Sequence, residues 1–150
     1  MKPSIHSNLS VRKYGGIPSD YQEVHDFLDM SKMTHSDLRH RCILHNTLGP
    51  FLAEKGIGVN HSKAEYLKKK YGWSDEEYQD ILSLASDRSG TTIVNADGVK
   101  VSVRDVAEQH IIQDMGEIPS VSKYLDGMPL YEWLGHGQKV VRKIVMRASA

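Results

Sequence analysis

Residues 34–54 decide the class of fold, and they read Thr34-His-Ser-Asp-Leu-Arg-His-Arg-Cys-Ile-Leu-His-Asn-Thr-Leu-Gly-Pro-Phe-Leu-Ala-Glu54. At about 100° per residue, His40, His45 and the apolar side chains fall within one arc of about 200°. An arc that wide is typical of a helix buried on most sides, so we expect one helix across this stretch. Because proline removes a backbone donor from a helix interior, Gly49-Pro50 predicts a kink or a short break in that helix, not a domain boundary.

Helical patterns and end signals recur along the rest of the chain, at 7–14, 20–31, 62–71, 74–88, 104–115, 119–125 and 129–134. Only 91–103 changes period, because its β-branched runs flank a turn that ends in Asp97-Gly98, which predicts a β-hairpin. Residues 139–146 fit a strand or a helix equally. We therefore expect a mainly α fold, a compact helical domain over 1–150 with one β-hairpin, in which 61–90 form an inserted helical pair.

The composition limits the classes of function. Nineteen basic and nineteen acidic residues give no net charge, so there is no strong signal for nucleic-acid binding. No apolar run approaches the length that spans a membrane. The single cysteine, Cys42, cannot form an intrachain disulfide, and we expect it to be a small buried residue. These features predict a cytoplasmic protein of a bacterium or of a phage-infected host, with a place in the virion as the alternative.

Histidine is the unusual residue of this chain, which has eight. Imidazole titrates near neutral pH and is the commonest metal ligand in proteins. The polar residues that interrupt apolar helical faces predict a site between packed helices, with ligands drawn from His25, His35, His40, His45, Glu108 and His110. Nitrogen and oxygen ligands without thiolate favour a divalent transition metal, namely zinc, iron, manganese or nickel.

Carboxylates complete this hypothesis. Asp26 or Asp114 is expected to orient a ligand histidine or to act as a general base, which makes these two the candidate catalytic residues. Glu108 lies at the centre of an apolar arc, where a buried carboxylate needs a cation, a metal or several donors. Two alternatives stay open: a structural network of hydrogen-bonded polar groups, and acid–base catalysis without metal. His6 precedes a helix and can fold back onto the core.

Three ordered segments carry a family resemblance: Val24-His-Asp-Phe-Leu-Asp-Met-Ser-Lys32, His35-Ser-Asp-Leu-Arg-His-Arg-Cys-Ile-Leu-His-Asn-Thr-Leu-Gly49 and Val101-Ser-Val-Arg-Asp-Val-Ala-Glu-Gln-His-Ile-Ile-Gln-Asp-Met-Gly-Glu-Ile-Pro-Ser120. Together they resemble a family of small, functionally uncharacterised, histidine-containing proteins of bacteriophages and bacteria. The resemblance implies a phage or prophage origin and no particular activity. It covers the chain to about Gly58 and again from about Asn95 to Leu134, which implies that 61–90 is an insertion. Its pattern includes the equivalents of His25, His35, His40, His45, Arg104, Asp105, Glu108, Gln109 and His110.

Two functions follow as hypotheses. The first is a small metal-binding protein that acts as a hydrolase of a phosphorylated or nucleotide substrate. The second is a non-catalytic phage accessory protein, either a virion component or a binder of a host protein, with a protein partner or a second copy of itself. Tyr66, Tyr71 and Trp73 in the predicted insertion are expected either to contact that partner or to form the small core of the inserted helices.

Overall fold

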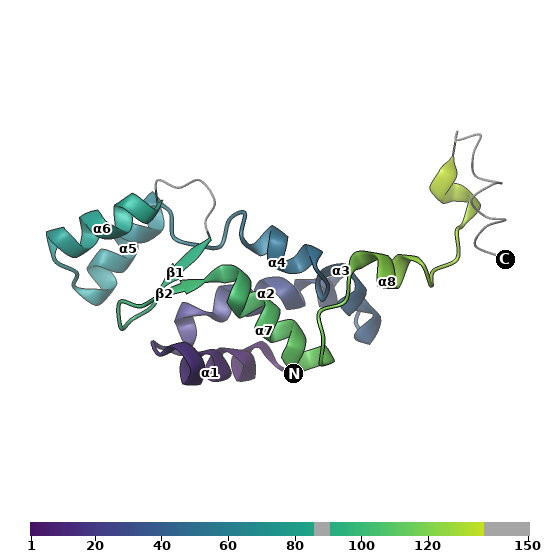
Figure 1. Ribbon diagram of the computed structural model, residues 1–150, viewed down its shortest axis with the longest axis horizontal. Coiled ribbons are helices and arrows are strands. Elements are labelled where there is room, and N and C mark those ends of the chain that lie inside the picture. Colours follow the sequence, from purple (N-terminus) through teal and green to yellow (C-terminus); the bar gives the residue numbers. More distant parts are fainter. Residues whose placement is uncertain (86–90, 137–150) are drawn as a thin grey trace.

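The structure is a computed structural model that describes residues 1–85 and 91–136. Its fold is mainly α, as predicted, with a single β-hairpin among the described residues (Figure 1). The α-helices are α1 (Pro3–Tyr14), α2 (Gln22–Asp29), α3 (Arg41–Leu44), α4 (Leu48–Ala53), α5 (His61–Tyr71), α6 (Asp75–Ala85), α7 (Val103–Met115) and α8 (Val121–Leu125). Short 3-10 helices cover Pro18–Asp20, Met30–Met33, Leu38–His40 and Glu132–Gly135. The predicted segment 139–146 lies outside the described residues.

Helix α7 is the centre of the fold, because α1, α2 and α4 all pack against it. In Figure 1 it lies between α1 below and α4 above, and α8 leads away from this body toward the C-terminal end. The main core joins the apolar side of α2 to that of α7. Its largest fully buried members include Tyr21, Leu28 and Ile111.

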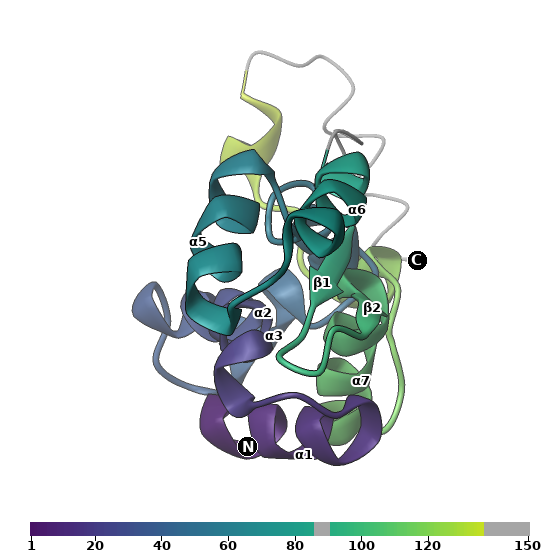
Figure 2. The ribbon, with the colours of Figure 1, turned by 90° about the vertical axis from the view of Figure 1, so that its left-hand side faces the viewer.

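The hairpin and the pair α5–α6 form the other end of the molecule (Figure 2). Strand β1 (Thr92–Val94) pairs antiparallel with β2 (Lys100–Ser102), and Ile93 lies opposite Val101. Because successive side chains of a strand point to opposite faces, Ile93 joins the main core while Val94 joins a second, smaller core with α5 and α6. Trp73 packs against that second core, whereas the Tyr66 side chain is 62% exposed.

The single helix predicted for 34–54 is wrong, because the chain turns at 45–47 instead of running on. The Asn46 side chain bonds the backbone there: its amide donates to the carbonyls of Cys42 and Ile43, and its oxygen accepts from the Leu48 amide. Gly49 fits under this turn because a Cβ atom there would lie 1.9 Å from the Leu44 carbonyl oxygen.

The same turn explains two further differences from the sequence prediction. Pro50 falls in the first turn of α4, where a missing amide hydrogen breaks no helical bond, so the break precedes the proline. Cys42, expected to be buried, is exposed, because the short helix α3 buries only Leu44. His45 ends α3 with a non-helical backbone, and its side chain is fully buried.

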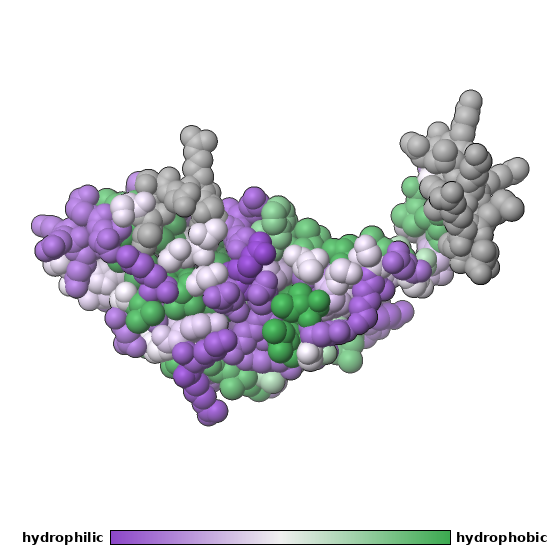
Figure 3. Space-filling model, viewed as in Figure 1, coloured by the Kyte–Doolittle hydropathy of each residue, from purple (hydrophilic) through white to green (hydrophobic). Residues whose placement is uncertain are grey.

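None of the helices in the described ranges combines the length and the apolar character that a membrane span needs. The surface seen in Figure 3 is mostly hydrophilic over the α5–α6 end, with apolar patches over the middle of the molecule. On α4, Leu48, Phe51 and Leu52 are each 39–46% exposed.

Candidate metal centre

Histidine and aspartate side chains from four chain segments come together: α1, α2, the turn after α3, and α7 itself. Helix α2 presents His25 and Asp29 four residues apart, and α7 presents His110 and Asp114 with the same spacing, so each pair shares one helical face. The turn after α3 adds His45, and α1 adds His6. All six side chains are at most 6% exposed, which makes this the most concentrated buried polar group among the described residues.

Four of these residues point one ligand atom each at a common centre. Nε2 of His45 lies 3.2 Å from Nε2 of His110, and it lies 3.1 Å from Oδ2 of Asp114 and 3.6 Å from Oδ1 of Asp29. Nε2 of His110 lies 3.5 Å from the same Asp114 oxygen and 3.6 Å from the same Asp29 oxygen. All four atoms fall within 4.8 Å of one another. We call this group the His₂Asp₂ cluster.

The distances within the His₂Asp₂ cluster match a tetrahedral ion site. Ligand atoms about 2.0–2.1 Å from a tetrahedral zinc ion are separated from each other by about 3.3–3.4 Å. The five distances given above lie between 3.1 and 3.6 Å and bracket that value. The rings of His45 and His110 are also inclined by 67°, so the in-plane lone pairs of the two Nε2 atoms can meet at one point.

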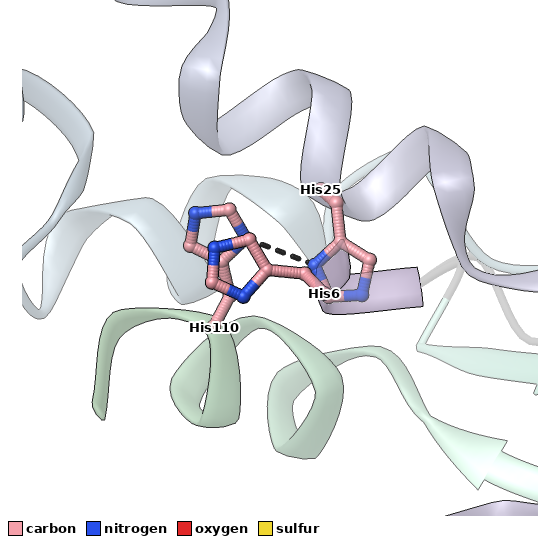
Figure 4. A group of neighbouring side chains, drawn as sticks. All are labelled: His6, His25 and His110. Carbon is pink, nitrogen blue, oxygen red and sulfur yellow. Dashed lines mark hydrogen bonds between the residues drawn. The ribbon is translucent and has the colours of Figure 1, made fainter. Parts of the chain in front are cut away.

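A second group, formed by His6, His25 and His110, has a different geometry (Figure 4). The His6 ring stacks on the His110 ring, with centroids 3.8 Å apart and planes inclined by only 24°. Since a ligand nitrogen binds a metal in the plane of its ring, two stacked rings cannot share one ion without rotating. Nδ1 of His25 instead lies 2.9 Å from Nδ1 of His110, at hydrogen-bond distance. This group is therefore a hydrogen-bonded stack beside the His₂Asp₂ cluster.

Both carboxylates of the His₂Asp₂ cluster also pair with cations, and the inward Oδ2 of Asp114 itself lies 3.6 Å from the Arg41 guanidinium. Oδ2 of Asp29 lies 3.0 Å from the Lys32 ammonium, and Oδ1 of Asp114 lies 2.9 Å from the α-amino group of Met1. The inward oxygen of Asp29 accepts no hydrogen bond from any described residue, although it is buried. A buried carboxylate oxygen without a donor is costly, and a bound cation would satisfy it.

Burial and charge set the protonation of these groups. Burial, reinforced by the neighbouring His110 and His6 rings, lowers the pKa of His25 to about 3. Burial, again reinforced by His110, lowers the pKa of His45 to about 4, although the bond to Asp114 opposes this shift. Burial alone would raise the pKa of Asp29, but the approach of His110 and Lys32 holds it well below its usual range. His45 is therefore neutral and Asp29 is ionised near neutral pH, and these are the forms of the two side chains that bind metal.

Burial and neighbouring groups also shift the pKa values of Asp114 and His6. Burial would raise the pKa of Asp114, but the Met1 ammonium and the nearby His6 and His110 rings lower it. Burial lowers the pKa of His6, and the hydrogen bond between its Nδ1 and Oε1 of Gln113, 2.6 Å apart, opposes that shift.

The structure brings together four of the residues predicted from sequence: His25, His45, His110 and Asp114. His40 lies next to them, with its ring edge-on to His45, but its Nδ1 pairs with Oγ of Ser31 at 2.8 Å. The other three predicted residues lie apart from the His₂Asp₂ cluster. The His35 side chain is 45% exposed beside Asp37, Asp26 is exposed and bonds Gln22, and Glu108 is half-buried, not buried as its apolar arc predicted.

Asp29 was not among the ligands predicted from the sequence. Its spacing of four from His25 was the available signal, and it repeats as His110 and Asp114 on α7. His6 was expected only to fold back on the core. Its position against His110 depends on how α1 packs across α7, which no local pattern reveals.

The sequence pattern of a protein family described as a domain of unknown function (DUF6915) matches residues 1–70 and 80–134 of this chain. Within the predicted insertion at 61–90 the match leaves out only 71–79, so an insertion of the whole helical pair stays a prediction. No curated protein and no solved structure matches the chain.

Proposed function

The chain belongs to the DUF6915 family, whose description assigns no activity, and from the site alone we propose that it binds one divalent transition metal ion in the His₂Asp₂ cluster. The main support for this proposal is that four ligand atoms converge at the spacing of a tetrahedral site: Nε2 of His45, Nε2 of His110, Oδ1 of Asp29 and Oδ2 of Asp114. Two carboxylates contribute negative charge at the ion, and the Lys32 ammonium, the Met1 α-amino group and the Arg41 guanidinium lie beside them. The unsatisfied oxygen of Asp29 gains its missing partner in the same step.

Zinc is the metal that this proposal favours over iron, manganese and nickel. A set of two imidazole nitrogens and two carboxylate oxygens suits each of them, so ligand chemistry alone does not decide. The spacing does favour one geometry, because adjacent ligands of an octahedral ion at about 2.1 Å would be only about 3.0 Å apart. Three of the five distances, at 3.5–3.6 Å, clearly exceed that value, and the other two, at 3.1 and 3.2 Å, lie between the octahedral and the tetrahedral spacings, which is the ground on which we favour zinc.

A stabilising role for the metal is favoured over a catalytic one. Zinc sites with four protein ligands are typical of structural centres, whereas catalytic zinc keeps one position for water or substrate. A surface cavity of about 260 Å³ is lined by residues of α5, β1 and the segments 19–23 and 57–59, and by none of the ligands. The predicted hydrolase would need Asp29 or Asp114 to leave the metal and act as a base. It stays a prediction, to be tested with the zinc-loaded protein on phosphate esters.

Elemental analysis of protein purified without an affinity tag tests the proposal. We expect close to one equivalent of zinc in the native protein, its loss in Asp29→Asn and in His45→Gln, and its retention in His35→Gln as the matched control at an exposed histidine. Less than about a tenth of an equivalent of any transition metal, together with no thermal shift when zinc is added to the native protein, would overturn it.

A further inference from the structure

Helix α1 is held against the core by an unusual surface. Its fully buried residues are polar, namely His6, Ser7 and Ser10, and only Val11 and Tyr14 add partly buried apolar contact. Two of the three lead toward the His₂Asp₂ cluster: His6 stacks on His110, and Oγ of Ser10 lies 2.9 Å from Nε2 of His25. Helix α1 therefore depends for its packing on the same histidines that surround the proposed metal.

Ser10, His25 and His110 form a continuous hydrogen-bonded chain that ends at the cluster. Oγ of Ser10 lies 3.1 Å from the His6 carbonyl oxygen and 2.9 Å from Nε2 of His25. Nδ1 of His25 lies 2.9 Å from Nδ1 of His110, and Nε2 of His110 faces the His₂Asp₂ cluster. A neutral imidazole carries one hydrogen, so the direction of one bond fixes the direction of all the others.

Two directions satisfy this chain, and they present different atoms to the cluster. In one direction Ser10 donates to the His6 carbonyl, His25 donates from Nε2 to Ser10, and His110 donates from Nδ1 to His25. Nε2 of His110 is then a bare lone pair, as metal ligation requires. In the other direction Ser10 donates to His25 and His25 donates from Nδ1 to His110. Nε2 of His110 then carries a hydrogen into the cluster, where Nε2 of His45, 3.2 Å away, is the nearest acceptor. Both directions contain the same number of protons.

Resting on the proposed function, we propose that metal binding reverses this chain and that Ser10 and His25 are the positioning residues of the ligand His110. The metal takes the Nε2 lone pair, so His110 carries its hydrogen on Nδ1, and His25 changes tautomer with it. The metal-bound direction uses both hydrogen bonds of Ser10, whereas the metal-free direction uses only the one to His25. Metal binding is thereby coupled to the packing of α1.

The serines of α1 provide a matched pair for the test. Ser7 and Ser10 are both buried, and each hydroxyl lies 3.1 Å from the carbonyl oxygen four residues earlier. Ser7 pairs with Gln22, at 2.8 Å, whereas Ser10 pairs with His25. Ser10→Ala removes two hydrogen bonds from the metal-bound direction but only one from the metal-free direction. We therefore expect Ser10→Ala to bind zinc about fivefold more weakly than the native protein does. Ser7→Ala should bind zinc as the native protein does.

The closing experiment records the ¹⁵N shifts of the imidazoles in the native protein, with and without one equivalent of zinc. We expect the protonated nitrogen of His25 to be Nδ1 without zinc and Nε2 with zinc. A His25 tautomer that zinc leaves unchanged overturns the reversal, as does an equal zinc affinity of the two serine variants. If instead no zinc is taken up and the His45 and His110 shifts stay constant, the metal site itself has failed, which separates the two proposals.

Discussion

The buried histidines make the stability of the protein depend on pH, and the size of this effect follows from two of them. His25 and His45 have a folded pKa of about 3 and about 4, against about 6.5 for histidine in an unfolded chain. Below pH 6.5 the unfolded chain takes up protons that the folded protein does not. The free energy of unfolding of the protein therefore falls as the pH drops from 6.5 toward 4. Above that range these two histidines do not make it depend on pH.

Between pH 7.5 and pH 5.5 each such histidine destabilises the metal-free fold by about 1.4 kcal/mol, and the two together by about 2.7 kcal/mol. Both side chains are almost fully buried, so solvent screening reduces this little. Because typical domains are stable by only about 5–15 kcal/mol, the effect is easily measured. Urea unfolding of the metal-free protein at the two pH values gives it directly.

Variants assign the effect to its source. His45→Gln should reduce the difference between the two pH values by about 1.4 kcal/mol, even though it destabilises the fold at neutral pH. His61→Gln, at an exposed position on α5, should leave the difference unchanged. A native protein that is more stable at pH 5.5 than at pH 7.5 would show protonated imidazoles paired with Asp29 and Asp114 and would refute the neutral, buried set.

Three further outcomes test the cluster and its supporting turns. Zinc affinity, measured by competition with a chelator, should stay nearly constant between about pH 6 and 8, because the pKa values of His45, Asp29 and Asp114 already lie below that range in the fold; a tenfold loss at pH 6 would contradict this. Gly49→Ala should lower the free energy of unfolding by about 3 kcal/mol or more, because the new Cβ would lie 1.9 Å from the Leu44 carbonyl oxygen. Gly56→Ala is the control and should cause no such loss, because nothing lies within 4 Å of a Cβ atom there. Asn95→Ala should lower the same quantity by about 3 kcal/mol in urea titrations, because the buried amide bonds the backbone of Tyr14, Asp97 and Val99 and the Tyr21 hydroxyl; a loss under about 1 kcal/mol would show that these bonds are replaced.

The sequence revealed the parts of the fold that depend on local pattern. The hairpin was predictable because its β-branched runs and Asp97-Gly98 turn change the period from helix to strand. Helix α7 was predictable because Ser102 caps it, its side chain accepting from the Asp105 amide, and Gly116 ends it. The break at 45–47 was hidden, because it depends on three hydrogen bonds of one side chain, Asn46, that a helical projection does not contain.

The candidate site, like the fold, could be predicted from the sequence only where it depends on local pattern. Spacing of four on one helix shows that His110 and Asp114 share a face, and it shows the same for His25 and Asp29. It does not show which faces meet, since that depends on how α2 and α7 pack. Glu108 has a suitable apolar arc on α7, yet it is only half-buried and is not among the converging ligand residues. Asp29 completes the tetrahedron only because α2 crosses α7 at this point.

The last prediction concerns where along the chain a bound metal acts. Its ligands come from α2, the turn after α3, and α7, and its hydrogen-bonded neighbours include α1. Helices α5 and α6 pack instead around a separate core that contains Val59, Ala64 and Ile81. Because amides exchange through local openings as well as global unfolding, zinc should slow exchange most in the elements that it joins.

At free zinc about a thousandfold above its Kd, binding adds about 4 kcal/mol to the free energy of unfolding. Amides of α1, α2 and α7 that exchange by opening the core should slow by up to the corresponding factor of about a thousand. Those of α5 and α6 that exchange through opening of the second core alone should not slow. Asp29→Asn should remove the zinc effect everywhere. Equal slowing of both ends of the chain would mean that the two cores open only together, and slowing confined to α5 and α6 would place the metal away from the His₂Asp₂ cluster.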